Sequence, residues 1–390
     1  MHIGIEATVW LNNRGYGRHA RALFSALIQL DQENRYTLFL DSATNEDTLP
    51  ERAEKKLVNA KAPTAVSAAA NGRRSLRDMW RMSQTISGAD CDLLLFPTVY
   101  SYIPVLSRAK KIVMIHDIIA ETYPQMTLPS PTARLFWKTK VALGRRQADA
   151  IVTVSDYSRQ GIAAHFHMPE EQIHVVSEAS DPVFGRLEKA QFTSKMKDVG
   201  LSDSQRHIIY VGGFGPHKNL ETLINAFANL AQDDTFADAR LVMVGEYKKE
   251  VFYSEINILQ QQIQELNIQD KVIFTGYLSD EELVILLNLA TVLALPSLME
   301  GFGLPAVEAA ACGCPVIATT ASPLPALLGE GGIFIDPTNT PALQDALVQV
   351  LRSEDRQRQM RQAGLQAAQS LTWPDAAQQM LDVIHRVSAS

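Results

Sequence analysis

The sequence has 390 residues, which at roughly 100–200 residues per domain allows two or three domains. Hydrophobic residues make up 46% and charged residues 20%, and the 21 glycines and 18 prolines are near average, so a disordered, collagen-like or mucin-like chain is excluded. The net charge of −7 arises from 36 basic and 43 acidic residues without a basic run, which disfavours nucleic acid as a partner.

The start of the chain and its cysteines indicate the compartment. MHIGIEATVW lacks the cationic and apolar regions of a signal peptide, and no run of about 18 apolar residues predicts a transmembrane helix. Cys91, Cys312 and Cys314 lie in apolar surroundings, and the last two are too close together for a usual structural metal pair. We expect a reduced, cytoplasmic protein, with peripheral association at the inner face of the membrane as a further option.

Short apolar runs alternate with helical patterns along the whole chain, which indicates an α/β protein with parallel sheets covered on both faces. The first six predicted strands are His2–Glu6, Tyr36–Leu40, Leu93–Phe96, Lys111–Ile115, Ala150–Val154 and Ile173–Val176. The next six are Ile208–Val211, Leu241–Val244, Val272–Phe274, Val292–Leu295, Val316–Ala318 and Ile333–Ile335. Predicted helices include Arg18–Leu30, Leu220–Ala231, Val251–Leu266, Asp280–Leu289 and Pro305–Ala311.

Two series of about six strands predict two doubly wound, Rossmann-like domains facing a cleft. The polar stretch Asp181–Ser204, which carries Pro182 and Gly200, should contain the division. We therefore expect an N-terminal domain over residues 1–182, completed by a C-terminal helix within 372–390, and a second domain over residues 183–371. Ligands in such folds bind at the carboxyl ends of the strands.

The stretch from Gly15 to Ala20 matches G-x-G-x-x-A, and Asp41 lies at the end of the next strand, as in a dinucleotide-binding fingerprint. However, eight residues separate the first strand from Gly15, whereas the fingerprint places glycine directly at the strand end. A flexible loop at the edge of the cleft, with Gly15 and Gly17 allowing backbone approach to a ligand, is the favoured interpretation, and a turn without function is the alternative.

Polar residues follow two further strands of the first domain. His116 and Asp117 end an apolar strand. His116 either contacts a ligand there or is a packed or capping residue, and Asp117 either caps the next segment or orients His116. Ser155 is a natural helix N-cap that could also bind a ligand. Asp90 and Asp92 resemble a metal-binding D-x-D, but they precede their strand, so a solvated strand entry is the better interpretation.

The second domain contains two segments suited to a nucleotide sugar. Its first strand ends in three glycines, Gly213 among them, and Lys218 then precedes a helix, which suits a diphosphate although the P-loop pattern is not met. Further on, Glu300-Gly-Phe-Gly-Leu-Pro opens a helix that carries Glu308. Backbone N–H groups at this helix start would bind phosphate, and the two carboxylates would accept hydrogen bonds from sugar hydroxyls.

With these motifs, the chain closely resembles the retaining glycosyltransferases of family 4, of the GT-B fold, over essentially its whole length. The most specific element is E-x7-E, from Glu300 to Glu308, and the tail from Leu371 resembles the terminal helix that returns to the first domain. The resemblance implies that Glu308 binds the donor ribose, Glu300 faces the transferred sugar, Lys218 binds the diphosphate and His116 lies beside the reacting sugar. It assigns the other donor contacts to Gly15, Gly17, Tyr277, Leu278, Gly301, Phe302, Gly303 and Leu304.

One position departs from the family pattern, because Gly213 stands where many relatives have arginine. The resemblance implies transfer of a hexose, from UDP-glucose or a similar UDP-hexose, to a glycan or lipid-linked glycan in bacterial polysaccharide biosynthesis, without a metal or other cofactor. GDP-mannose-dependent mannosyl transfer is the alternative. A sugar-nucleotide epimerase and a non-catalytic carbohydrate-binding protein stay open as other classes.

Overall fold

The computed structural model describes residues 1–12, 15–41, 49–58, 75–128, 130–247 and 254–389, in two compact units. Unit 1 comprises Met1–Glu178 and Thr372–Ser390, and unit 2 comprises Ala179–Leu371. The chain thus passes into unit 2 after Glu178, ahead of the division predicted after residue 182. Polarity did not mark the boundary, because the polar stretch from Asp181 also contains buried residues such as Phe184 and Met196.

Unit 1 contains a seven-stranded parallel sheet with the order β3-β2-β1-β4-β5-β6-β7. The strands are β1 (His2–Glu6), β2 (Arg35–Asp41), β3 (Ala53–Val58), β4 (Leu93–Phe96), β5 (Lys110–Met114), β6 (Ala150–Thr153) and β7 (Ile173–Val175). In the central register, Ile3 pairs with Tyr36 on one side and Leu93 on the other. The order reverses beside β1, which makes the carboxyl end of this strand a topological switch point.

Strand β3 was not predicted from the sequence. Its residues AEKKLV are buried only at Ala53 and Val58, and the four between them are exposed. A strand at the edge of a sheet is partly exposed to solvent, so its sequence need not be continuously apolar. An apolar run therefore does not predict β3.

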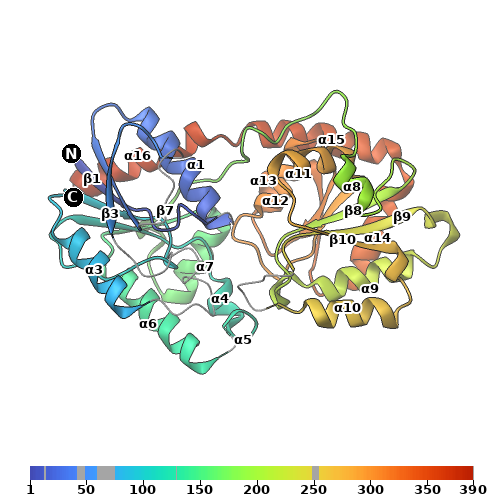
Figure 1. Ribbon diagram of the computed structural model, residues 1–390, viewed down its shortest axis with the longest axis horizontal. Coiled ribbons are helices and arrows are strands. Elements are labelled where there is room, and N and C mark those ends of the chain that lie inside the picture. Colours follow the sequence, from blue (N-terminus) through green and yellow to red (C-terminus); the bar gives the residue numbers. More distant parts are fainter. Residues whose placement is uncertain (13–14, 42–48, 59–74, 129, 248–253, 390) are drawn as a thin grey trace. The chain divides into compact units, whose positions relative to one another are not determined.

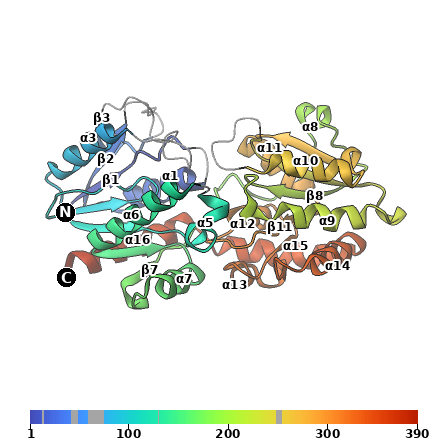
Figure 2. The ribbon, with the colours of Figure 1, turned by 90° about the horizontal axis from the view of Figure 1, so that it is seen from below.

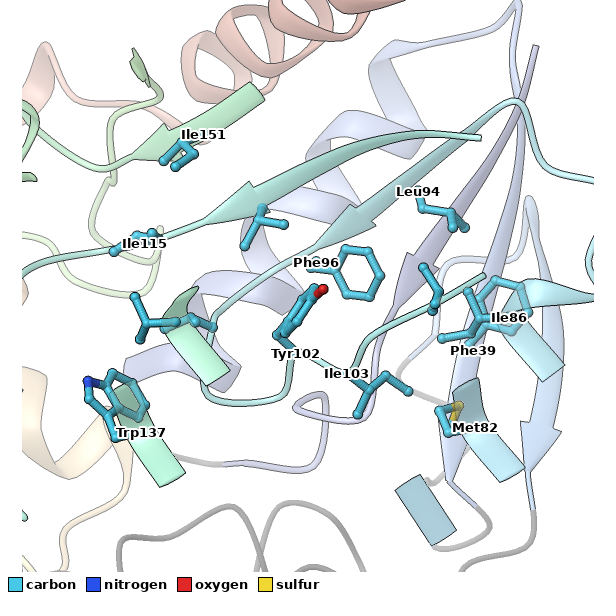
Figure 3. Packing of buried hydrophobic residues seen from close by; sticks show 14 of the residues in the cluster. Phe39, Met82, Ile86, Leu94, Phe96, Tyr102, Ile103, Ile115, Trp137 and Ile151 are labelled. Atoms are coloured by element: carbon cyan, nitrogen blue, oxygen red, sulfur yellow. The ribbon is translucent and has the colours of Figure 1, made fainter. Parts of the chain in front are cut away.

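Helices cover both faces of this sheet (Figure 1). They are α1 (Gly15–Leu30), α3 (Leu76–Ser87), α4 (Ile119–Thr122), α5 (Pro124–Thr127), α6 (Pro131–Gln147), α7 (Asp156–Phe166) and α16 (Trp373–Ala389), with a 3-10 turn at Glu170–Gln172. On one face, Met82 of α3 and Trp137 of α6 pack with Phe39, Phe96 and neighbouring strand residues (Figure 3). On the other face α1 packs against α16, so the C-terminal helix completes unit 1.

Unit 2 contains a six-stranded parallel sheet with the order β10-β9-β8-β11-β12-β13. The strands are β8 (Arg206–Val211), β9 (Ala239–Val244), β10 (Val272–Gly276), β11 (Val292–Leu295), β12 (Val316–Thr319) and β13 (Gly332–Ile335). This is the Rossmann order, and its switch point lies between β8 and β11. All six strands were predicted, because strands buried on both faces give apolar runs.

The helices of unit 2 form two layers around its sheet (Figure 1). They are α8 (Ser194–Asp198), α9 (Leu220–Leu230), α10 (Ile256–Glu265), α11 (Asp280–Leu289), α12 (Leu304–Ala311), α13 (Leu324–Leu328), α14 (Thr340–Arg352) and α15 (Glu354–Gln369). Four 3-10 turns lie at Pro216–Lys218, Asp234–Phe236, Gln269–Lys271 and Gly329–Gly331. Helix α9 packs against α10 and α14, whereas α12 packs against α13 and α15, and Figure 2 shows α14 beside α15. Residues 251–253 of one predicted helix lie outside the described residues.

Among the residues that the structure describes, no helix is long and apolar enough to cross a membrane.

Candidate functional site

The switch point of unit 2 brings together the two segments that the sequence singled out. The segment after β8 leads through a 3-10 turn at Pro216–Lys218 into α9, and the segment after β11 leads into α12. The backbone N–H of Leu298 donates to the carbonyl of His217 at 2.9 Å. Asn219, in the left-handed conformation, donates its side-chain amide to the carbonyl of Pro296 at 3.0 Å. These bonds tie the two segments to each other at one edge of the sheet.

Lys218 and Glu300 form an ion pair at this edge. The Lys218 Nζ atom lies 2.7 Å from Glu300 Oε1, and the side chains are 20% and 10% exposed. The hydroxyl of Ser297 donates to the same carboxylate oxygen at 2.6 Å. The sequence assigned Lys218 to a diphosphate and Glu300 to a sugar, and the structure joins the two in one polar cluster with Ser297, which the sequence did not single out.

The start of α12 depends on Gly303. This N-cap residue has φ of 87°, a left-handed conformation, and a Cβ atom here would lie 2.7 Å from Leu324 Cδ1. Gly301 and Phe302 are buried before it, and Leu304 begins the helix. Pro305 has no N–H group, and the N–H of Ala306 donates to the Gly303 carbonyl at 2.9 Å. The donors that this helix start can offer to an anion are therefore the N–H groups of Gly303 and Leu304, together with the positive end of the helix dipole.

Glu308 lies within α12 and is only 2% exposed. A carboxylate so deeply buried requires partners that carry hydrogen-bond donors or positive charge. Together with Glu300, it gives the β11–α12 segment two carboxylates on either side of a helix N-terminus.

The remaining unit 2 candidates differ in exposure. Gly213 is exposed, and its carbonyl accepts a hydrogen bond from the Tyr210 hydroxyl. Tyr277 follows β10 and is 57% exposed, whereas Leu278 is buried in the core. Leu278 can therefore reach a ligand only through its backbone, whereas the ring of Tyr277 is available to one.

His217 was missed by the sequence analysis. Burial, followed by the neighbouring Lys218 charge, lowers the pKa of His217 to about 4, so its imidazole is neutral at physiological pH. A neutral ring adds no third charge to the Lys218–Glu300 pair. Neither periodicity nor spacing in the sequence predicts the lowered pKa of His217. The shift arises because the segment after β8 folds back onto the loop after β11.

In unit 1, His116 lies just after β5 and is buried. Its Nε2 atom lies 2.9 Å from the carbonyl oxygen of Pro97, and its Nδ1 atom lies 3.4 Å from Glu178 Oε1. Burial disfavours the charged imidazole, but the Glu178 carboxylate outweighs this effect and raises the pKa of His116. The neighbouring Asp117 accepts a hydrogen bond from the backbone of Ile119 at 2.9 Å, at the start of α4, whose N-cap residue is Ile118.

Glu178 and His19 are further residues that the sequence analysis missed. Glu178 follows β7, and His19 lies on α1 with its Nδ1 atom 3.7 Å from Glu178 Oε1. Burial lowers the pKa of His19 to about 4, and both histidines lower the pKa of Glu178 against the opposing effect of burial. Among the described residues, these three side chains could hold a metal ion, since one ligand atom from each lies within 4.8 Å of the others.

The glycine loop predicted around Gly15 and Gly17 is wrong. The structure places both glycines in the first turn of α1. A Cβ atom on Gly17 would lie 1.8 Å from the backbone oxygen of Asn12, whereas one on Gly15 would meet nothing within 4 Å. Gly17 thus allows the start of the helix to pack closely against the preceding chain. In the sequence alone, a glycine required for such packing cannot be distinguished from one that allows a ligand to approach the backbone.

Two other sequence interpretations are confirmed. The Ser155 hydroxyl accepts from the backbone of Ser158 at 3.1 Å and caps α7. Asp92 lies before β4, and its carboxylate accepts from the backbone of His2 at 2.7 Å, so it is a structural part of the strand entry.

Comparisons with known proteins cover nearly the whole chain. The family model "Glycosyltransferase Family 4" matches residues 13–183, and "Glycosyl transferases group 1" matches residues 191–367. Serotype-specific mannosyltransferase WbdA of Escherichia coli is 26% identical over all of this chain and 48% of its own length. The chain therefore spans about half of that relative. O-antigen chain mannosyltransferase B of E. coli is 28% identical over 68% of each chain.

Solved structures share the fold. Sucrose-phosphate synthase from Thermosynechococcus elongatus has a TM-score of 0.76 at 18% identity, covering 100% of this chain and 99% of that one. Anabaena Alr3699/HepE in complex with UDP-glucose has a TM-score of 0.73 at 17% identity, covering 99% of both chains. The two parallel Rossmann-like sheets and the two family matches lead to one conclusion: the chain belongs to family 4 of the glycosyltransferases and has the GT-B fold.

Proposed function

We propose that this protein is a retaining glycosyltransferase that moves a hexose from a nucleotide-sugar donor to a glycan or lipid-linked glycan in polysaccharide biosynthesis. The observation that carries the proposal is the Lys218–Glu300–Ser297 cluster beside the start of α12. It combines a cation for the diphosphate, a carboxylate for sugar hydroxyls and a helix N-terminus for an anion, which are the three parts that a nucleotide sugar requires.

In the proposed reaction, the bond between the sugar C1 atom and the diphosphate oxygen breaks while C1 bonds to the acceptor oxygen on the same face. The departing phosphate oxygen takes the proton of the acceptor hydroxyl. Lys218 and the backbone N–H groups at α12 stabilise the negative charge that grows on the diphosphate. Glu300 accepts hydrogen bonds from the transferred sugar, and Glu308 accepts them from the ribose.

Two donor classes are supported by different observations. The sequence favoured UDP-glucose or a similar UDP-hexose, and one structural neighbour was solved with UDP-glucose. WbdA, O-antigen chain mannosyltransferase B and RfbU are all mannosyltransferases by name, which supports GDP-mannose as strongly. We propose that the donor is one of these two.

A thermal-shift panel of UDP-glucose, GDP-mannose and an ADP-sugar tests the donor, because a ligand at 100 times its Kd stabilises the native state by about 2.7 kcal/mol. The stabilising donor is then incubated with candidate acceptors, and the products are separated. Transfer to acceptor supports the proposal. Conversion of the donor to an epimer would show an epimerase, and binding of glycans without turnover of any donor would show a carbohydrate-binding protein.

We further propose that transfer needs no metal, since the diphosphate charge is met by Lys218, backbone N–H groups and a helix dipole. Turnover of the metal-free protein in EDTA should be no lower than that of the untreated protein. A loss of turnover in EDTA that Mg²⁺ restores would contradict this part of the proposal.

A further inference from the structure

Three metal-binding side chains meet inside unit 1, each from a different element. His19 comes from α1, His116 follows β5 and Glu178 follows β7. All three are buried, with His19 only 2% exposed. Two imidazoles and a carboxylate are ligands that zinc accepts, whereas Mg²⁺ and Ca²⁺ prefer oxygen ligands alone.

The distances fit one small ion. Ligand atoms about 2.0–2.2 Å from a tetrahedral zinc lie about 3.4 Å from one another. Glu178 Oε1 lies 3.4 Å from His116 Nδ1 and 3.7 Å from His19 Nδ1. The two imidazole rings are 4.6 Å apart at their centroids and nearly perpendicular, so both Nδ1 atoms can approach one point beside the carboxylate after small shifts.

The hydrogen bonding of the two rings supports the same site. His19 has no hydrogen-bond partner for either ring nitrogen among the described residues, although both atoms are buried. An unsatisfied buried polar atom is costly, and a metal on Nδ1 would satisfy one of them. His116 has its other nitrogen, Nε2, 2.9 Å from the Pro97 carbonyl, which is the outer contact that usually orients a metal-bound histidine.

The surroundings also suit a cation. Asp117, next to His116, adds a second negative charge whose field acts on the imidazole. The ring of Trp373 from α16 lies 5.7 Å from that of His19, and the ring of Tyr16 lies 5.1 Å from that of His116, between centroids. Two aromatic rings thus pack against the histidines of the cluster.

We propose that His19, His116 and Glu178 bind one Zn²⁺ ion in unit 1, and that this ion inhibits transfer. The inhibition rests on the proposed function and on the expectation, from the family resemblance, that the His116 imidazole acts beside the reacting sugar. Zinc on the Nδ1 atom of His116 would withdraw the ring from that role. The site itself rests only on the geometry of unit 1. Zinc is therefore an inhibitor of this protein and no part of its chemistry.

The test uses the full chain, freed of metal with EDTA and dialysed. Zn²⁺ is titrated calorimetrically, and Co²⁺ is added as a spectroscopic probe, because a tetrahedral Co²⁺ site with imidazole ligands absorbs visible light. The variants are His19→Ala and Glu178→Gln. The matched control is His207→Ala, since His207 in unit 2 is equally buried and also lacks hydrogen-bond partners for both ring nitrogens, but belongs to no such ligand cluster among the described residues.

We expect one zinc per chain, affinity lowered by about 10- to 100-fold or more in both variants and unchanged in the control. Nucleotide affinity, measured in parallel, reports that unit 2 of each variant is intact. An absence of saturable zinc binding, or binding unaffected by either variant, would overturn the site. Binding at the cluster without loss of transfer would uphold the site, and would contradict both the proposed inhibition and the expected role of His116 beside the reacting sugar.

Discussion

At the scale of single residues, the Lys218–Glu300 ion pair is the centre of the proposed donor site. Each side chain neutralises the other across 2.7 Å, so removing one leaves an uncompensated charge in a partly buried position. In the proposed function, the donor diphosphate competes with Glu300 for the Lys218 ammonium. The effect of a substitution at either residue depends on the other.

We predict that Lys218→Ala weakens UDP binding and lowers kcat by about 100- to 1,000-fold, since it removes a preorganised cation and exposes the diphosphate to the Glu300 charge. The double variant Lys218→Ala/Glu300→Gln should recover part of the UDP affinity, but not turnover. Calorimetry with UDP and donor turnover measure both. Equal UDP affinity in wild type and Lys218→Ala would contradict the assignment.

His116 should behave differently from Lys218, because it belongs to unit 1 whereas the nucleotide-binding candidates lie in unit 2. We predict that His116→Ala lowers kcat and leaves UDP affinity nearly unchanged. Steady-state kinetics and UDP titration separate the two effects. Loss of UDP binding in this variant would show that the assignment of His116 is wrong.

Glu308 is predicted to bind the ribose through charge-assisted hydrogen bonds, each of about 1.5–3 kcal/mol. Glu308→Gln, which preserves the shape of the buried side chain, should therefore weaken binding of both UDP and GDP. The exposed Glu330, replaced by Gln, is the control. If both nucleotides bind Glu308→Gln as tightly as wild type, the carboxylate does not contact the ribose.

Glu121 gives a prediction for pH. Burial raises the pKa of Glu121 to about 7, although the Trp137 indole donates to it at 2.8 Å. The folded state then holds a proton that the unfolded state releases near pH 4.5, so stability should fall as pH rises from about 4.5 to 7, by up to about 1.4 kcal/mol per pH unit. Glu121→Gln should remove this slope in denaturant unfolding of the protein. A slope that persists in the variant belongs to other groups.

At the scale of elements, the start of α1 requires glycine at one position and tolerates a side chain at another. Gly17 packs against the backbone of Asn12, whereas Gly15 faces open space in the same helical turn. We predict that Gly17→Ala destabilises the protein, and that Gly15→Ala stabilises it by about 0.4–1 kcal/mol because alanine restricts the unfolded chain. Thermal unfolding of the matched pair tests this. Equal effects of the two substitutions would contradict the close packing at Gly17.

The strands show what an apolar run can predict. Every central strand of both sheets was predicted, with ends that differ by a residue or two, because burial on both faces demands continuous apolar sequence. The edge strand β3 carries charged residues and was missed. The helix start at Gly15 was taken as a loop because glycine favours turns, and tertiary packing at Gly17 outweighs that preference.

At the scale of the whole molecule, α16 joins the last residues of the chain to unit 1. Its buried side chains, among them Trp373, Met380 and Ile384, cover the face formed with α1. We predict that deletion of residues 372–390 lowers the melting temperature of unit 1 and leaves nucleotide binding by unit 2 intact. Met380→Ala should cost about 2–5 kcal/mol, with the exposed Gln378→Ala as the control. Calorimetric scans with and without UDP distinguish the units, and loss of UDP binding on deletion would contradict their independence.

The sequence by itself determined the α/β class, the two Rossmann-like sheets and the segments from Gly213 to Lys218 and from Glu300 to Glu308. Those features are local, because apolar runs, glycines and helix starts depend on neighbouring residues. The tertiary structure alone decided that Lys218 contacts Glu300 and that His19, His116 and Glu178 share one buried cluster. Residues so far apart in the chain meet because parallel strands bring their carboxyl ends, and the helices that follow them, to one edge of the sheet.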